Sequence, residues 1–204
     1  MAKRIDDYKN LDINQNICNQ HGVFRMNDNT LATVEIISQD SAVVQLENAE
    51  CLTELIEEFR FYAEHITRFY NTKFELLKEF PHKNLIEIDI FELQPSQFFV
   101  NEDKVNAVSS FVNSSKDVII PIIKKDEMII ALDGHTRLYA ASMKGIKTVF
   151  VFDTETDQYI YDFVEEAQRR NIKNVSNLKR LSHEDYEKEW YSYCDNYFKD
   201  KKGE

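Results

Sequence analysis

The sequence predicts an α+β protein with a small mixed sheet at its centre. Residues 83–155 alternate short apolar runs with helix-like segments, which is typical of a compact mixed unit. Residues 50–80 instead carry apolar side chains at helical spacing, and the residues after 155 also favour helices. We therefore expect three parts: a hairpin and long helix in 1–82, a sheet-based core in 83–155, and a helical extension in 156–204.

The N-terminal part begins without regular periodicity. Residues 1–30 are rich in Asn and Asp, which favours loops. Two β-like runs follow, TLATVEIIS and SAVVQLE, with turn residues Gln39–Ser41 between them. This pattern predicts a β-hairpin preceded by loop.

A long amphipathic helix is predicted between Glu50 and Phe80. Apolar and aromatic residues recur there every three or four positions, and Pro81 follows as a stop signal. The helix would have about eight turns. Its wide aromatic stripe needs a partner surface, which is either the protein's own core or a second copy of the chain. A homodimer through the 50–80 helix is therefore one expectation.

The core and the extension have clear element signals. NLIEIDIFEL reads as a strand and NEDKVNAVSSFVNS as a helix, while DVIIPIIKK and EMIIALD read as two strands joined near Lys124-Lys125. Two helices are expected after residue 155, and Ser182 and Asp185 have capping-box spacing at the start of the second. Its aromatic residues share one face, which predicts a packing seam: Tyr186, Trp190, Tyr193 and Tyr197.

Composition narrows the function classes. The formal charge of −11 argues against non-specific binding to DNA or RNA, which needs Lys and Arg to displace counterions. No run of apolar residues is long enough for a membrane span. The three cysteines are far apart and lack zinc-site spacing. We expect a soluble, cytoplasmic protein with reduced cysteines and no membrane partner.

The stretch IIALDGHTRLYAASMKG holds the candidate site. An apolar strand ends at Asp133-Gly134 and passes into a helix, whose first backbone N–H groups lack partners and favour an anion such as phosphate. Gly134 allows a close approach, and Arg137 can grip the same anion in bidentate fashion. Asp133 can cap the helix or hold a divalent cation, and His135 can act as acid, base or donor.

A plainer interpretation of the same stretch is structural. Asp133 would be an N-cap, Gly134 would ease a turn, and the helix would only pack on the sheet. The stretch has neither a P-loop lysine nor a GxGxxG pattern, so its spacing alone does not establish a phosphate site.

A family resemblance adds to this interpretation. The pattern L-x-P-x-x…K-V from Leu93 to Val105, then VIIPIIKKDEMIIALDGHTRLYAA and GIKTVFVF, resembles the ParB/sulfiredoxin domain in order and spacing. The resemblance covers residues 85–155 and centres on G-x-x-R-x-x-A at Gly134, Arg137 and Ala140. That superfamily includes chromosome-partitioning CTP switches, sulfiredoxins, free-serine kinases and ParB-like nucleases. The resemblance implies a fold and a phosphate site, but it does not choose among these functions.

Two of these functions fit the residues poorly. Sulfiredoxins carry their catalytic Cys at the position of His135, and a histidine cannot form the sulfur–sulfur intermediate of that reaction. Partitioning ParB proteins carry Gly-Glu-Arg-Arg at the position of residues 134–137 and append a helix-turn-helix reader. The acidic residues after Glu155 show no such reader. The sequence therefore argues against both activities.

The free-serine kinases are more similar at the motif. They carry Asp-Gly-His-His-Arg, and four of these five residues match: Asp133, Gly134, His135 and Arg137. Thr136 replaces the second histidine. Their expected base is a glutamate at the position of Gln97, and a glutamine cannot accept a proton in that role. Glu102 lies nearby in sequence as a substitute base.

The leading expectation is a bacterial, cytosolic protein that binds a nucleotide or another phosphorylated ligand. Mg²⁺ with ATP, ADP or CTP would be the cofactor, held in part by Asp133. Ligand contacts are expected from three residues of the turn and from three residues of an opposite wall: Gly134, Thr136, Arg137, Pro95, Ser96 and Gln97. If turnover occurs, His135 and Asp133 are the catalytic candidates.

Three alternatives stay open at this stage. The first is a free-serine-kinase-like phosphotransferase or a nucleotide hydrolase that uses His135 or a glutamate as base. The second is a ParB-like nuclease or DNA-associated protein, although the acidic charge makes DNA a poor partner. The third is a scaffold for dimerisation with no ligand.

Overall fold

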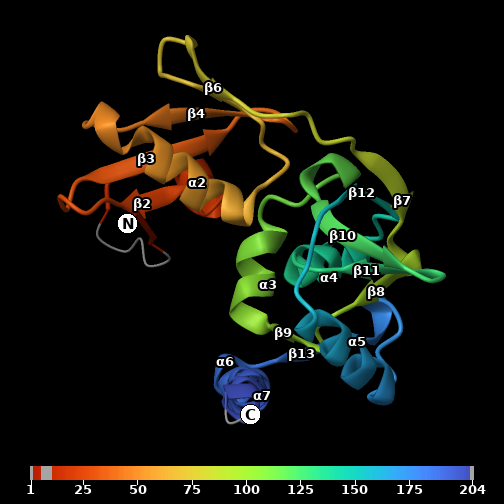
Figure 1. Ribbon diagram of the computed structural model, residues 1–204. Coiled ribbons are helices and arrows are strands. Elements are labelled where there is room, and N and C mark those ends of the chain that lie inside the picture. Colours follow the sequence, from red (N-terminus) through yellow and green to blue (C-terminus); the bar gives the residue numbers. More distant parts are fainter. Residues whose placement is uncertain (1, 6–10, 203–204) are drawn as a thin grey trace. The chain divides into compact units, whose positions relative to one another are not determined.

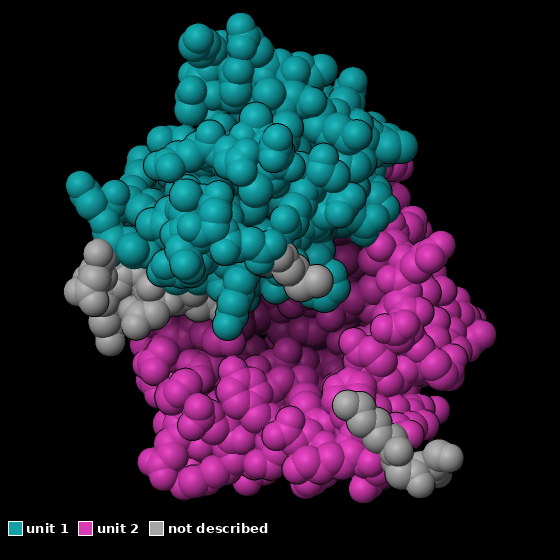
Figure 2. Space-filling model, turned by 60° about the vertical axis from the view of Figure 1, so that its left-hand side comes forward, with its two compact units in different colours: residues 1–83 teal, residues 84–204 magenta. Residues whose placement is uncertain are grey.

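The chain folds into two compact units. The computed structural model describes residues 2–5 and 11–202 and divides the chain into Met1–Lys83 (unit 1) and Asn84–Glu204 (unit 2), coloured separately in Figure 2. Both units are built on sheets with helices packed beside them, so the fold is mixed α+β as the sequence predicts. Residues 156–204 belong to the same compact unit as the sheet-based core.

Unit 1 contains a six-stranded sheet in sequence order (Figure 1). Its strands are β1 (Lys3–Arg4), β2 (Val23–Arg25), β3 (Leu31–Ile36), β4 (Ser41–Gln45), β5 (Arg68–Tyr70) and β6 (Leu76–Glu79). All neighbours are antiparallel except β4 and β5, which are parallel. A parallel pair needs a crossover, and the crossover here is the 3₁₀ turn η1 (Ala49–Cys51) followed by α2 (Leu52–Tyr62).

The core of unit 1 lies between α2 and the sheet. Leu55, Ile56 and Phe59 of α2 are buried against it. The Phe59 ring meets those of Phe24 and Phe69 edge to face, at centroid distances of 6.1 and 6.0 Å. Such edge-to-face pairs add to the stabilisation that burial of apolar surface provides. The predicted β3–β4 hairpin is confirmed, with Ile36 opposite Ala42.

The predicted long helix is wrong beyond Tyr62. The chain leaves helical geometry at Ala63 (φ −142°, ψ 57°) and forms the β5–β6 hairpin instead. Asn71 sets the turn, because its Oδ1 accepts hydrogen bonds from the backbone N–H groups of Lys73 (2.9 Å) and Glu75 (3.0 Å). Pairing with β4 overrides the helical spacing, and the continuous helix on which the dimer expectation rested is absent.

The loop prediction for residues 1–30 is wrong for three short elements of the described part; residues 1 and 6–10 lie outside that part. β1, α1 (Gln15–Asn19) and β2 occupy this region. The asparagines act as caps, since Asn14 Oδ1 accepts from the N–H of Asn16 at 2.9 Å. Gly22 is required by packing: a Cβ there would lie 2.0 Å from the Val34 carbonyl oxygen.

Unit 2 is built on a five-stranded sheet with strand order β7-β12-β10-β11-β8. Its strands are β7 (Ile86–Asp89), β8 (Leu93–Pro95), β10 (Ile119–Lys125), β11 (Met128–Ala131) and β12 (Thr148–Asp153). The β10–β12 and β11–β8 pairs are parallel and the other two are antiparallel. A separate parallel pair joins β9 (Phe99–Asn101) to β13 (Lys179–Leu181).

Helices and short turns complete unit 2. The helices are α3 (Glu102–Ser109), α4 (His135–Met143), α5 (Tyr159–Arg169), α6 (His183–Tyr186) and α7 (Ser192–Lys202), with a π-helical turn, η5 (Glu187–Tyr191), between the last two. The 3₁₀ turns are η2 (Ile90–Glu92), η3 (Ser115–Asp117) and η4 (Val175–Asn177). Ser182 caps α6 by accepting from the N–H of Asp185 (3.1 Å), as its spacing predicts.

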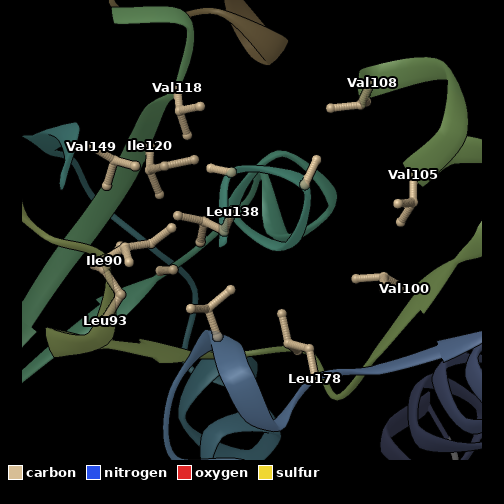
Figure 3. Close-up of a cluster of buried hydrophobic side chains, with 14 of the residues drawn as sticks. Ile90, Leu93, Val100, Val105, Val108, Val118, Ile120, Leu138, Val149 and Leu178 are labelled. Carbon is tan, nitrogen blue, oxygen red and sulfur yellow. The ribbon is translucent and has the colours of Figure 1, made fainter. Parts of the chain in front are cut away.

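The core of unit 2 surrounds α4. Side chains from β10 and β12 approach α4 from one side and those of α3 from the other, with Leu138 facing Ile120 (Figure 3). Lys144, just after α4, ties the end of α3 to this core. Its Nζ donates to the carbonyl oxygens of Ser109 and Val112, both at 2.6 Å. The Ser109 carbonyl is one that the end of α3 leaves without a helical partner, and Val112 lies in the segment that follows.

Two further contacts join the C-terminal elements to this core. The Gln94 side chain of β8 donates to the Ile172 carbonyl (2.9 Å) and accepts from Gln168 (3.3 Å). The aromatic face that was expected to be a packing seam does pack, since the ring centroids of Trp190 and Phe98 are 4.8 Å apart.

Candidate functional site

The candidate site begins at the turn between β11 and α4. Gly134 is the N-cap of α4 in the left-handed region (φ 75°), and no side chain caps the helix. The plainer interpretation of Asp133 as the N-cap is therefore wrong. Its side chain is instead 68% exposed. The N–H groups of the first turn of α4 consequently carry the partial positive charge of an uncapped helix N-terminus.

The Arg137 guanidinium lies back over this turn. Its Nη2 and Nε would be 3.1 and 3.3 Å from a Cβ added to Gly134, and Ile120 Cδ1 would be 2.5 Å away. Arg137 Nη2 is 4.0 Å from Asp133 Oδ2, too far for a hydrogen bond. Within the described residues the Arg137 side chain makes no hydrogen bond, so its donors are available at the same place as the helix N-terminus.

His135 is buried beneath the turn and is 4% exposed. The backbone N–H of Ser96 donates to His135 Nε2 at 3.1 Å, so this nitrogen carries a lone pair and no proton. Burial lowers the pKa of His135 from 6.5 to about 4, against the opposing effects of the Asp133 charge and the Ala131 carbonyl. The imidazole is therefore neutral near pH 7, and its Nε2 is already engaged.

The Ser96–His135 contact places the end of β8 beside the Asp133–Arg137 turn, as predicted for an opposite wall of the site. Pro95 and Ser96 are buried at the end of β8, and the Ser96 hydroxyl donates to the Ala131 carbonyl at 2.8 Å. The neighbouring Gln97 side chain donates from Nε2 to the carbonyl of Phe99 and to Tyr186 Oη, the latter at 3.0 Å. Ser96 thus contacts the Asp133–Arg137 turn through His135, and the next residue, Gln97, contacts Tyr186.

Two other candidates, Thr136 and Glu102, lie in the first turns of α4 and α3. Thr136 is partly buried in the first turn of α4. Glu102, the substitute base, begins α3 and forms an ion pair with Arg180 at 2.5 Å. Its carboxylate is therefore already paired with a guanidinium.

Tyr186 is a neighbour of Gln97 that the sequence marked only as a packing residue. It is 5% exposed, and its hydroxyl lies against Gln97. Burial is the main cause that raises the pKa of Tyr186; the neighbouring Tyr191 and the Asp133 charge add to the effect. The phenol stays protonated at physiological pH. Its aromatic periodicity predicted packing only, and no local signal links it to a turn about fifty residues earlier in the chain.

The described residues contain neither a prearranged metal site nor a membrane-spanning helix. No group of three or more His, Cys, Asp or Glu side chains is placed to hold a metal ion there. A Mg²⁺ ion at Asp133 would therefore take most of its ligands from phosphate oxygens and water, as Mg²⁺ commonly does. No helix in this part of the chain is long and apolar enough to cross a membrane.

Comparisons with known proteins give little further guidance. No protein-family model and no curated protein matches the chain. Among solved structures, protein Atu1540 from Agrobacterium tumefaciens is similar with a TM-score of 0.36 and 18% identity. The match covers 50% of this chain and 64% of that one. A likeness at this level carries no argument about fold family or function.

Proposed function

We propose that the chain binds a phosphorylated small molecule at the Asp133–Arg137 turn, and that residues 83–155 form a ParB/sulfiredoxin-like domain in the cytoplasm. Nucleotides with Mg²⁺, namely ATP, ADP or CTP, are the first candidates. The observation that carries the proposal is the combination of an uncapped α4 N-terminus with the Arg137 guanidinium lying over it. Backbone N–H groups and an arginine at one point are a recurring arrangement for phosphate oxygens.

Binding without turnover fits the site better than catalysis does. A general base needs an accessible lone pair near the reacting group. His135 is buried with Nε2 occupied, and Gln97 cannot accept a proton. Asp133 is the exposed carboxylate at the turn and is better placed to approach a cation. A phosphotransferase of the free-serine-kinase type is the second candidate function, because the Asp-Gly-His motif and Arg137 are shared with those enzymes.

Nucleic acid is a weaker candidate. Unit 2 contains sixteen Lys and Arg residues against twenty-two Asp and Glu residues, so it has no overall excess of positive charge with which to displace counterions.

The test is the thermal stability of the full chain with ATP, ADP, CTP and GTP, each with and without Mg²⁺. A ligand at a hundredfold excess over its Kd stabilises the native state by roughly 2.7 kcal/mol. We expect one nucleotide to raise the melting temperature of the wild type, and Arg137→Ala to abolish the rise. Arg169→Ala is the control, since Arg169 is an exposed arginine of α5 paired with Glu166 at 2.9 Å. Absence of any shift in the wild type, or an equal shift in Arg137→Ala, would contradict the proposal.

A further inference from the structure

The C-terminal segment is held against β9 and the start of α3 by several contacts. β13 pairs in parallel with β9, immediately after the Pro95–Gln97 wall. Asn101 Nδ2 lies 3.0 Å from His183 Nδ1, and Arg180 pairs with Glu102. Because the start of α6 is fixed in this way, Tyr186, in the first turn of that segment, is directed to Gln97.

The Tyr186 hydroxyl has an unused donor. Gln97 Nε2 donates to the phenol oxygen, so the phenol proton is free to be donated elsewhere. Within residues 2–5 and 11–202, no hydrogen-bond acceptor for this proton is found. A buried hydroxyl without an acceptor is costly, and a ligand oxygen would satisfy it. This unsatisfied donor, beside Gln97, is an observation independent of the α4 N-terminus.

The backbone next to Tyr186 is unusual as well. The π-helical turn η5 follows directly and brings the Tyr186 and Tyr191 rings edge to face, at 5.2 Å. Such π turns are rare and often lie at functional sites. Trp190 in the same turn packs on Phe98, the residue after Gln97. The wall of the site and the C-terminal segment therefore share one packed cluster.

We propose that Tyr186 contacts the ligand, donating its phenol hydrogen bond to an anionic oxygen of the phosphorylated molecule held by Arg137 and the α4 N-terminus. The C-terminal segment, residues 182–202, then forms the third side of the site. This inference rests on the proposed function, because the acceptor it requires is the phosphorylated ligand.

The experiment compares ligand affinity in the full chain by calorimetry, with inorganic pyrophosphate and Mg²⁺–ATP as the probes. Tyr186→Phe keeps the buried ring and removes the hydroxyl. We expect this change to weaken binding about three- to tenfold, the effect of one lost hydrogen bond. Tyr191→Phe, on the same segment and more exposed, is expected to leave affinity unchanged.

Trp190, the single tryptophan, shows whether the segment stays in place. Unchanged fluorescence of ligand-free Tyr186→Phe, together with weaker binding, would support the proposal. Altered ligand-free fluorescence with a matching loss of stability would overturn it in favour of a purely structural role. If the wild type binds and Tyr186→Phe binds equally well, this inference is wrong while the proposed function stands. If the wild type binds neither probe and no nucleotide, both are wrong.

Discussion

The buried His135 should make the stability of unit 2 depend on pH in a defined window. In the unfolded chain this histidine binds a proton below about pH 6.5. In the folded chain it does so only below about pH 4, because burial lowers its pKa. Between these values the unfolded state holds more protons, so acid favours unfolding. The stabilisation present above pH 6.5 is lost as the pH falls towards 4. The fall in the pKa of His135 from 6.5 to about 4 corresponds to about 3 kcal/mol of stability.

The variant that isolates this effect is His135→Gln, which does not titrate and can still accept a hydrogen bond from Ser96. Urea unfolding followed by the fluorescence of Trp190 reports on unit 2, since the chain has no other tryptophan. We expect the wild type to lose about 3 kcal/mol more than His135→Gln between pH 7 and pH 4. His82→Gln is the control, because the His82 side chain is 69% exposed, and it should follow the wild type. If the free energy of unfolding fell equally with pH in the wild type and in His135→Gln, the conclusion that His135 is buried and neutral would be refuted.

Three further changes test the packing of single residues. Gly134→Ala should cost about 2–4 kcal/mol in urea unfolding, because a Cβ would meet Ile120, whereas Gly145→Ala, at a similar φ (74°) but with open space around it, should cost about 1 kcal/mol; equal losses would contradict the predicted clash. Lys144→Met should lower the free energy of unfolding by about 1 kcal/mol by removing the bonds to the end of α3, and an unchanged value would show that water replaces them. Phe74→Asn should raise the melting temperature of unit 1 in calorimetry, since Phe74 is exposed and has a positive φ (61°) that asparagine tolerates better; a lower melting temperature would mean that the ring stabilises the turn.

Sequence reasoning succeeded where the deciding signals are local. The β3–β4 hairpin has turn residues between two apolar runs, and α4 has a glycine at each end. It failed between Ala63 and Phe80, where helical spacing coincides with a run rich in aromatic residues. There the partner strand β4 decides the structure, and β4 is distant in sequence. Asn71 was the one local sign of a turn in this range.

The candidate site was predictable only in part. The Asp-Gly junction, with Arg137 one turn later, marks the candidate site in the sequence but does not by itself establish that it binds an anion. That His135 would accept from the Ser96 backbone depends on β8 lying beside β11, a pairing between segments far apart in the chain. The contact of Tyr186 with Gln97 could not be predicted for the same reason, because the position of Tyr186 is set by the β9–β13 pair. Local patterns show which groups could do chemistry, whereas tertiary pairing determines which of them remain available.

The Gln94 contacts also cover part of an outer strand of unit 2. β8 is an outer strand of its sheet, and exposed outer strands can recruit strands from other molecules. Here Leu93 and Gln94 are buried, and Gln94 bonds to the segment after α5. At the opposite edge, β7 is short and carries the charges of Glu87 and Asp89, which discourage such recruitment. Proteolytic loss of the chain beyond Asp157 would uncover β8, and we expect the shortened products to self-associate through that strand.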